Sequence, residues 1–420
     1  MTRNLTFMDP AVVECPYPAY QRLLDDSPVF LDPVGGFYIL SRYEDVRQAL
    51  LDTRTYICED FTIRLRDKVQ AERAERARRR FADAGWVPGP SILMLPDSRH
   101  REVRKVFERA FRAGKIKEVD DFVRDTAYQL VDAFAADGRC DIVRHFAVPL
   151  PLIVIGTQVG VPRAEAWKIK EWTDAWINRL GMLLSEEEDA RAVEMEIEAQ
   201  HYLKQIMDRL RETPDGTVLS DLVNTTMSDG LTLSDEELFT HLLADIFVAG
   251  SETTTNSLSA GVMLLCQHEE WYARLKADQE TYLRPFIEEV LRVESPVQGL
   301  FRVAGRDIEL HGVTIPKGAV IQLRYGAANR DERHFACPAS FDLDRRNAGS
   351  HLAFGSGVHH CIGAPLARRE MYWGFKALLD RLDDLRLEPG SNDFSHMRSI
   401  MHRALKNLHV TFDARLGADR

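Results

Sequence analysis

The sequence predicts a mainly α-helical protein with small β-sheets, built as one large domain over residues 1–420. Apolar residues recur at helical spacing through most of the chain. Strand-like runs bounded by turn residues are confined to 28–41, 298–325 and 408–412. No Gly/Ser/Pro-rich linker divides the 420 residues, and their 45% hydrophobic content supplies enough apolar material for one large core.

The helical periodicity places most of the expected helices by residue number. The 28–41 hairpin turns at Gly35-Gly36, and Asp97 or Ser98 is the expected N-cap of the third helix. The expected helices cover 16–26, 42–51, 97–112, 119–136, 143–159, 164–182, 187–213, 218–227, 281–294 and the stretch from Cys361 to about Leu382.

The longest expected helix begins at Leu233-Ser234 and continues to about Cys266. Ser234 and Glu237 have the spacing of a capping box. Its middle, Ala249–Thr255, reads AGSETTT. A glycine and three β-branched threonines form a poor helix centre. We therefore expect a local weakness there, which favours a functional site.

Charge and cysteine content narrow the class of protein. The formal net charge is −11, which argues against nucleic-acid binding. Six cysteines without paired spacing indicate a reducing compartment. No secretory signal is visible, and no apolar run approaches the ~20 residues of a membrane span. We expect a soluble cytoplasmic protein without a membrane anchor.

Two basic segments depart from this acidic average. Residues 64–80 hold eight Lys/Arg against three Asp/Glu, which is typical of a solvated helix face. Only Phe81 and Trp86 lie near it for base stacking, so a nucleic-acid patch is disfavoured. Residues 99–117 hold eight Lys/Arg and two Glu.

A glycine-punctuated loop carries the main chemical signal. Residues 351–363 read HLAFGSGVHHCIG, and Cys361 precedes an apolar helical run. A cysteine at a helix start sees free N–H donors and partial positive charge, which favour the thiolate. Three interpretations compete: an inert buried cysteine, a zinc site with His359 and His360 that lacks further ligands, and a thiolate ligand to heme iron.

The whole pattern F-G-x-G-x-H-x-C-x-G resembles the heme-binding loop of the cytochrome P450 family. The residues that match it are Phe354, Gly355, Gly357, His359, Cys361 and Gly363. The resemblance covers essentially all of the chain and is to the soluble bacterial branch. It implies the cytochrome P450 fold with a long central oxygen-activating helix, heme b (iron protoporphyrin IX) as cofactor, and Cys361 as the iron ligand.

The resemblance implies further roles. His100 and Arg104, one helical turn apart, together with Arg302 and His351 match the family's partners of the heme propionates. Phe354, Gly355, His359, Gly363 and Ala249 are implied heme contacts. Glu289 and Arg292, at i and i+3, and Arg345 match a buried Glu–Arg–Arg network that supports the fold around the heme-binding loop. Without the resemblance, an i,i+3 pair is ordinary surface decoration.

The stretch A-G-x-E-T-T resembles the family's oxygen-activation motif. Cleavage of the O–O bond consumes two protons, and a carboxylate beside a hydroxyl organises the waters that bring them. Glu252 and Thr253 supply this pair, and Gly250 leaves room for O₂. Peroxide-using members commonly lack the pair, so its presence favours an oxygenase fed by external electrons.

The substrate pocket is implied by resemblance alone. Its expected lining comes from 60–95, from the helix near Asp245 and Val248, and from Val297, Leu300, Ile400 and Met401. Asp245 shares a helix stripe with Glu252. It either binds a substrate hydroxyl or amine, or turns outward to a basic neighbour. The basic 64–80 segment falls where relatives carry a variable segment over the pocket, so a charged lid is a further hypothesis.

The resemblance implies a monooxygenase that inserts one atom of O₂ into a small organic substrate by hydroxylation, O-demethylation or epoxidation. Electrons would come from NAD(P)H through a reductase and a ferredoxin or flavodoxin. A basic surface with Arg101, Lys105, Arg109 and Arg112 would steer such an acidic carrier. A heme sensor or carrier and a cysteine- or zinc-dependent hydrolase are the alternatives. The intact Glu252-Thr253 pair disfavours the sensor or carrier. The hydrolase is disfavoured because the sequence shows no paired base or complete ligand set.

Overall fold

The computed structural model describes residues 5–65, 68–180 and 184–415. Contacts group the chain into two compact units, and three of the four boundaries between them fall inside helices. Unit 1 holds the described residues of Met1–Ile57, Phe122–Leu150 and Thr253–Arg420, and unit 2 those of Cys58–Asp121 and Pro151–Glu252. The single-domain organisation over 1–420 stays a prediction.

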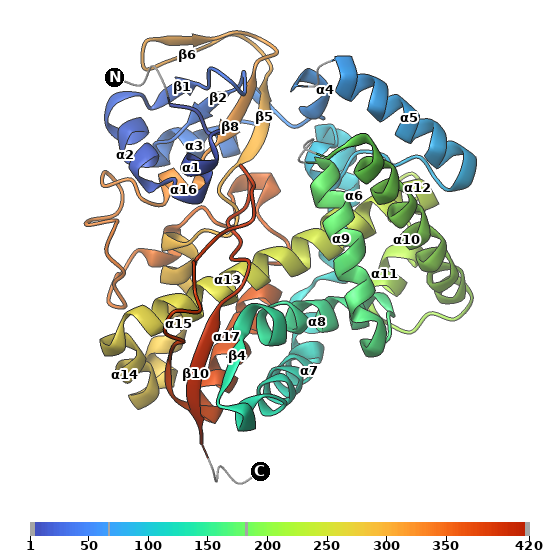
Figure 1. The fold of residues 1–420 in the computed structure, drawn as a ribbon. Coiled ribbons are helices and arrows are strands. Elements are labelled where there is room, and N and C mark those ends of the chain that lie inside the picture. The colour runs from blue at the N-terminus through green and yellow to red at the C-terminus, as the bar shows by residue number, and fades with distance from the viewer. Residues whose placement is uncertain (1–4, 66–67, 181–183, 416–420) are drawn as a thin grey trace. The chain divides into compact units, whose positions relative to one another are not determined.

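Unit 1 contains all the strands, in three sheets (Figure 1). The five-stranded sheet has the order β1-β2-β8-β5-β3, and only its β2–β8 pairing is parallel. Its strands are β1 (Val29–Leu31), β2 (Tyr38–Leu40), β8 (Val320–Leu323), β5 (Leu300–Ala304) and β3 (Tyr56–Ile57). The two smaller sheets are β4 (Arg139–Asp141), β10 (His409–Ala414) and β9 (Leu382–Leu387), and β6 (Ile308–Leu310) with β7 (Val313–Ile315).

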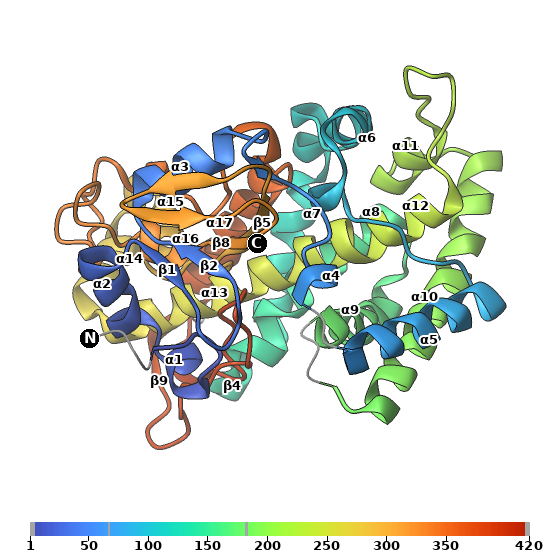
Figure 2. The ribbon, with the colours of Figure 1, turned by 90° about the horizontal axis from the view of Figure 1, so that it is seen from above.

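The predicted hairpin at 28–41 is confirmed as β1 and β2, paired antiparallel. Asp32 organises its turn, because its Oδ1 accepts hydrogen bonds from the N–H groups of Val34 (3.0 Å) and Gly35 (2.8 Å). Gly36 completes the turn with a positive φ of 69°. Helices α2, α3 and α16 lie beside this sheet in both ribbon views (Figures 1 and 2).

Helices make up most of both units, which confirms the predicted fold class. The helices within unit 1 are α1 (Pro10–Glu14), α2 (Tyr17–Asp26), α3 (Tyr43–Leu51), α14 (Glu269–Ala277), α15 (Gln279–Val293), α16 (Tyr325–Ala328) and α17 (Ala364–Arg381). Those within unit 2 are α4 (Thr62–Leu65), α5 (Lys68–Ala84), α6 (Asp97–Ala110), α9 (Ala166–Leu180), α10 (Glu186–Glu212), α11 (Val218–Asn224) and α12 (Asp235–Thr240). One unit boundary follows β3, and the other three fall inside α7 (Ala113–Asp132), α8 (Pro149–Val159) and α13 (Ala249–Gln267).

Three predictions about helix ends and helix strength are wrong. The last helix, α17, begins at Ala364, after Gly363 and before Pro365, so Cys361 lies in the preceding loop. Pro365 suits a first helical turn because its missing N–H has no partner there in any case. Helix α6 is preceded by Pro96, without a side-chain cap, so neither Asp97 nor Ser98 is the N-cap.

The predicted weakness at Ala249–Thr255 is also misplaced. That stretch is regular α-helix, and the irregular part is the π-helix His241–Val248 just before it. A second π-helix, Val143–Ala147, opens the helix that was expected over 143–159. Wide turns of this kind occur frequently at functional sites. The capping box of Ser234 and Glu237 is confirmed at the start of α12. The remaining short turns are 3₁₀ segments at Ile92–Met94, Ala135–Asp137, Arg163–Glu165, Ala348–Ser350 and Gly357–His359.

The basic segment at 64–80 falls on α4 and α5, apart from residues 66 and 67, which lie outside the described residues. Helix α5 buries Phe81 against Val193 and Ile197 of α10. Arg80 pairs with Glu194 of the same helix, with Nε–Oε1 at 2.6 Å. The segment is therefore an amphipathic helix along α10 (Figure 2). Its role as a lid stays a prediction.

Among residues 5–65, 68–180 and 184–415, no helix combines the length and the apolar character that crossing a bilayer requires.

Candidate active site

The cysteine loop of unit 1 presents Cys361 on an exposed turn. Gly355 (φ 67°) and Gly357 (φ 69°) adopt left-handed conformations that favour glycine. A Cβ atom at Gly357 would lie 3.0 Å from the carbonyl oxygen of Leu50, so this position also needs glycine for space. The N–H of Cys361 donates to the carbonyl of Phe354 at 2.9 Å, which closes the loop and fixes the cysteine backbone.

The predicted Glu–Arg–Arg residues come together in unit 1. Glu289 and Arg292 are both fully buried and form a bidentate pair, with Nε–Oε2 and Nη2–Oε1 at 2.7 Å each. Arg345 adds a hydrogen bond from Nε to Oε1 of Glu289 at 3.0 Å. Arg292 also donates to three backbone carbonyls, at residues 329, 338 and 340. The cluster therefore ties α15 to the irregular segment that leads into the cysteine loop.

His351, a predicted propionate partner, is engaged within unit 1. Its Nε2 lies 3.2 Å from Oε2 of Glu288, and its Nδ1 accepts from the N–H of Ala353 at 3.1 Å. Arg368 of α17 donates to both oxygens of Glu288, at 2.6 and 2.9 Å. Burial raises the pKa of Glu288, but Arg368 and His351 outweigh it and hold this pKa at about 2. Glu288 is thus an ionised anchor for His351.

The other predicted propionate partners are accounted for within their own units. Arg302 of β5 is buried in unit 1, where its Nη1 donates to the carbonyl of Phe301 at 2.8 Å. In unit 2, His100 is buried on α6, and Arg104 one turn later donates from Nε to Glu108 at 3.0 Å. Each remains a cationic or N–H side chain on a fixed backbone, and their roles stay predictions.

Glu252 of α13 meets a cation that sequence reasoning missed. Nζ of Lys170, on α9, lies 3.2 Å from Oε1 of Glu252 and also pairs with Asp174. The side chains of Lys170 and Glu252 are 23% and 14% exposed. Burial raises the pKa of Glu252, and Lys170 opposes this shift. The net effect is a raised pKa, because the burial of the carboxyl group outweighs the attraction of Lys170.

Two residues close to Glu252 on α13, Gly250 and Thr254, have different surroundings. A Cβ atom at Gly250 would meet only Ile155, at 3.5 Å, which is an ordinary contact, so packing within unit 2 does not require this glycine. In unit 1, the hydroxyl of Thr254 donates to Oε2 of the fully buried Glu370 at 3.2 Å. Burial raises the pKa of Glu370 to about 8, because no cation compensates its charge.

Asp245 turns to partners inside unit 2. Its Oδ2 lies 2.7 Å from Nδ1 of His241, one turn earlier, and accepts from the N–H of Ile92 at 2.9 Å. The carboxylate thus joins the π-helix to the 3₁₀ turn that contains Ile92. The side chain does not turn outward, because it is only 6% exposed and its histidine partner is buried as well, and a role in substrate binding stays a prediction. Val248, three residues later, is buried.

The predicted pocket residues of unit 1 lie together at the backbone. Val297 forms a β-bridge with His402, and the carbonyl of Met401 accepts from the N–H of Gln298 at 2.6 Å. The carbonyl of Ile400 accepts from Nη1 of Arg324 at 2.5 Å. Leu300, three residues after Val297, opens β5. Val297 and Leu300 are half-buried, which leaves part of each side chain accessible.

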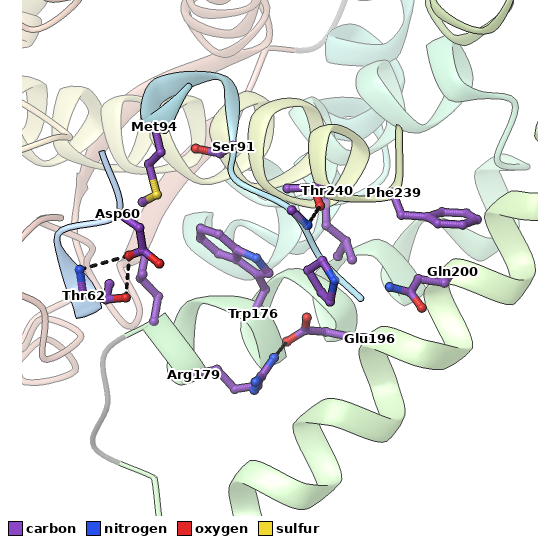
Figure 3. A pocket seen from close by; sticks show the side chains of 14 residues that line it. Asp60, Thr62, Ser91, Met94, Trp176, Arg179, Glu196, Gln200, Phe239 and Thr240 are labelled. Carbon is purple, nitrogen blue, oxygen red and sulfur yellow. Dashed lines mark hydrogen bonds and ion pairs between the residues drawn. The ribbon is translucent and has the colours of Figure 1, made fainter. Parts of the chain in front are cut away.

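Unit 2 itself contains a cavity of about 150 Å³ (Figure 3). Part of its wall falls inside the predicted 60–95 lining, and these members are Asp60, Thr62, Pro88, Gly89, Ser91 and Met94. The rest comes from helices that sequence reasoning did not assign to a pocket, and its members are Trp176, Arg179 and Leu180 of α9, Glu196 and Gln200 of α10, and Phe239, Thr240 and Leu243. Only the general location of this wall, not its composition, was predictable.

No group of three or more His, Cys, Asp and Glu side chains has metal-binding geometry in the part of the chain that the structure describes, so the zinc interpretation of Cys361 gains no support.

Comparison with known proteins identifies the family of this chain. The family model described as Cytochrome P450 matches residues 159–401. Cytochrome P450 107B1 of Saccharopolyspora erythraea is 32% identical over 412 residues, which covers 97% of each chain. The chain belongs to the cytochrome P450 family.

Other P450 proteins agree in sequence and in fold. The cytochrome P450 monooxygenase PikC of Streptomyces venezuelae is 33% identical over 403 residues, 94% of this chain and 90% of PikC. The structure of cytochrome P450 CYP109Q5 from Chondromyces apiculatus superimposes with a TM-score of 0.84 at 28% identity, covering 99% of this chain and all of that one. The chain is a P450 monooxygenase, a heme-iron oxidoreductase that uses O₂.

The residues of the cysteine loop fit such a heme. Cys361 is exposed, its backbone is fixed by Phe354, and the flanking glycines keep side chains away from its sulfur. A Cβ atom at Gly363 would lie 3.9 Å from Sγ of Cys361, an ordinary contact distance, so this glycine lies directly beside the thiol. A flat group could approach the sulfur across these glycines.

Proposed function

We propose that the protein is a heme b monooxygenase that inserts one oxygen atom of O₂ into a small organic substrate, with Cys361 as the axial thiolate ligand. The observation that carries the proposal is the loop of Gly355, Gly357 and Cys361, which matches the family's pattern and presents the sulfur on an open surface. When bound, the heme supplies an iron that activates O₂, and a thiolate ligand favours cleavage of the O–O bond.

Other predicted residues would contact the heme, bind its propionates or support its loop. Phe354, His359, Gly363 and Ala249 would contact the heme. His100, Arg104, Arg302 and His351 would hold its propionates, which need cationic or N–H partners when buried. Glu288 fixes the orientation of the His351 ring through its contact with Nε2. The Glu289 cluster would keep the loop in place.

Glu252 and Thr253 would deliver protons. Glu252 is buried, its pKa is raised, and its one cationic partner, Lys170, is shared with Asp174. A carboxyl group whose pKa is raised holds a proton more readily than an ordinary glutamate, which suits a role in proton transfer. Thr253, next on α13, would place its hydroxyl to pass the proton toward bound O₂. Gly250 would leave the space for O₂, since packing does not require a glycine there.

Electrons would come from NAD(P)H through a reductase and a ferredoxin or flavodoxin. Of the four predicted cations on the basic surface, Lys105 pairs with Glu102 at 2.9 Å, and Arg112 lies 3.8 Å from Asp221. Arg101 and Arg109 are exposed and make no ion pair among the described residues. These two would therefore steer an acidic carrier, and the rate of reduction should fall as salt rises. Charge reversal at both should remove that salt dependence.

A cytoplasmic location is part of the proposal, because six cysteines without paired spacing are typical of a reducing compartment.

The test is reconstitution with a ferredoxin or flavodoxin, its reductase and NAD(P)H, using a substrate found by a ligand-binding spectral screen. Hydroxylation, O-demethylation and epoxidation are distinguished by the product. In the Thr253→Ala variant, NAD(P)H consumption should continue while hydrogen peroxide replaces most of the product. Unchanged product per NAD(P)H would remove the proposed proton route.

A further inference from the structure

The cavity of unit 2 contains an excess of negative charge. Arg179 of α9 is already neutralised by two carboxylates of α10, Glu196 on Nη1 (2.7 Å) and Asp189 on Nε (3.2 Å). Asp60 contributes a third carboxylate to the same region, and it makes no ion pair among the described residues. The hydroxyl and N–H of Thr62 bond only to Oδ1 of Asp60, at 2.5 and 3.0 Å, so Oδ2 is left without a partner.

The other polar side chains of the cavity differ in whether they already form hydrogen bonds within the protein. Gln200 is bonded through both of its amide atoms to the backbone of Trp86, and the hydroxyl of Thr240 is bonded to Gly89 and Glu236. Ser91 is only 8% exposed, and its hydroxyl makes no hydrogen bond within the described residues. The hydroxyl of Ser91 is therefore available to a polar group of a ligand in the cavity.

The remaining wall is apolar and aromatic. In the view of Figure 3, Asp60, Thr62 and Met94 gather at one end of the cavity, Gln200 and Phe239 at the other, and Trp176 between them. A carboxylate beside an indole ring is the combination that binds an organic cation, because both the charge and the ring quadrupole attract it. A carboxylate ligand would instead have to displace Glu196 or Asp189 from Arg179 and would face the charge of Asp60.

We infer that this cavity binds the basic nitrogen of an otherwise apolar substrate, with the cation between Asp60 and Trp176 and a hydrogen-bonding group at Ser91. The volume of about 150 Å³ is smaller than the ~300–1,000 Å³ of whole ligand sites, so it holds one end of the substrate.

This inference rests on the proposed monooxygenase function, because it assigns the substrate class of that enzyme. The test is calorimetric titration of the holoenzyme with three compounds that share a decyl chain: decyltrimethylammonium, decan-1-ol and decanoate. The quaternary nitrogen has no lone pair, so it cannot bind the iron. The ammonium compound should bind about tenfold more tightly than the alcohol, and decanoate most weakly.

Two variants locate the effect. In Asp60→Asn, which keeps an oxygen for Thr62, the ammonium compound should lose its advantage while the alcohol binds as before. Trp176→Leu should also weaken the ammonium compound more than the alcohol. Asp83→Asn removes the same charge from the exposed face of α5 and should change neither. Equal binding of the three compounds, a preference for decanoate, or an unaltered preference in Asp60→Asn would overturn the inference.

The carbon monoxide spectrum separates this inference from the proposed function. All three variants should keep the strongly red-shifted Soret band of the reduced wild-type protein. A lost cation preference with that band intact would contradict only the substrate class. A wild-type protein without the band would contradict the proposed function, whatever the titrations give.

Discussion

Glu289 of unit 1 and Glu252 of unit 2 are both buried carboxylates beside cations, but they are bound in opposite ways. Glu289 accepts four hydrogen bonds, from Arg292 twice, from Arg345 and from the N–H of Asp342 at 3.0 Å. Glu252 has one cation, Lys170 at 3.2 Å, which it shares with Asp174. Four hydrogen bonds fix the Glu289 carboxylate in place, whereas the raised pKa of Glu252 shows that its single shared cation does not offset its burial.

Glu370 extends the comparison to a buried carboxyl group with no cation. Its only side-chain partner is the hydroxyl of Thr254, and its pKa is raised to about 8 by burial. The three glutamates therefore form a series with two, one and no cationic partners. We therefore expect substitution of Glu289 to change stability and substitution of Glu370 to change the pH dependence of stability. Disturbing Glu252 should change catalysis.

The largest expected effect is on Glu289. Glu289→Gln leaves Arg292 and Arg345 with no carboxylate, and breaking a buried pair in this way costs about 3–5 kcal/mol. Urea denaturation should show this as a lower midpoint. The control is Glu75→Gln on α5, whose exposed pairs with Arg78 and Arg79 should leave the midpoint unchanged. Equal midpoints in both variants would mean that the buried cluster does not support the fold.

The second prediction concerns the pH dependence of stability. Glu370 has a folded pKa of about 8 against 4.5 for the ordinary group, so between these values the folded state binds more protons than the unfolded state. Its contribution to stability is complete below the lower value and is lost as pH rises, by about 1.4 kcal/mol per pH unit. Glu370→Gln should abolish this loss. Parallel stability curves for the variant and the wild type would contradict the assignment.

The third and smallest expected effect is on the pH dependence of catalysis, and it distinguishes Glu252 from Glu289 and Glu370. Lys170→Met removes the group that opposes the raised pKa of Glu252, so this pKa should rise further. The pH profile of product formation should shift to higher pH, with little change in the unfolding midpoint. Lys168→Met, on the same helix but paired with the surface residue Glu165, is the matched control. If the two variants gave the same profile as the wild type, Glu252 would not limit proton delivery.

The sequence predicted the covalent neighbourhood of each site better than its partners from elsewhere in the chain. Glu289 and Arg292 are visible as an i,i+3 pair, and the cysteine loop as a glycine pattern. Lys170 is far from Glu252 in sequence, and nothing in the periodicity of α9 distinguishes it from its other lysines. Their contact depends on helix packing, which is set by many small side-chain fits.

The position of the irregular helical turn was also predicted wrongly from the sequence. The β-branched run in Ala249–Thr255 indicated a weak helix, yet tertiary packing keeps it regular, with Thr255 donating to the carbonyl of Ala147 and Thr254 to Glu370. The π-helix falls instead on His241–Val248, where propensity gives no warning and Asp245 bonds to both His241 and Ile92. Propensity is a weak guide where such contacts decide.

The central claim is that Cys361 is the thiolate ligand of a heme, and the absorption spectrum of the reduced protein under carbon monoxide tests it most directly. The wild-type protein should show a strongly red-shifted Soret band, and Cys361→Ser should bind heme but lose that band. A wild-type spectrum without the shift, or a Cys361→Ser spectrum that keeps it, would contradict the account.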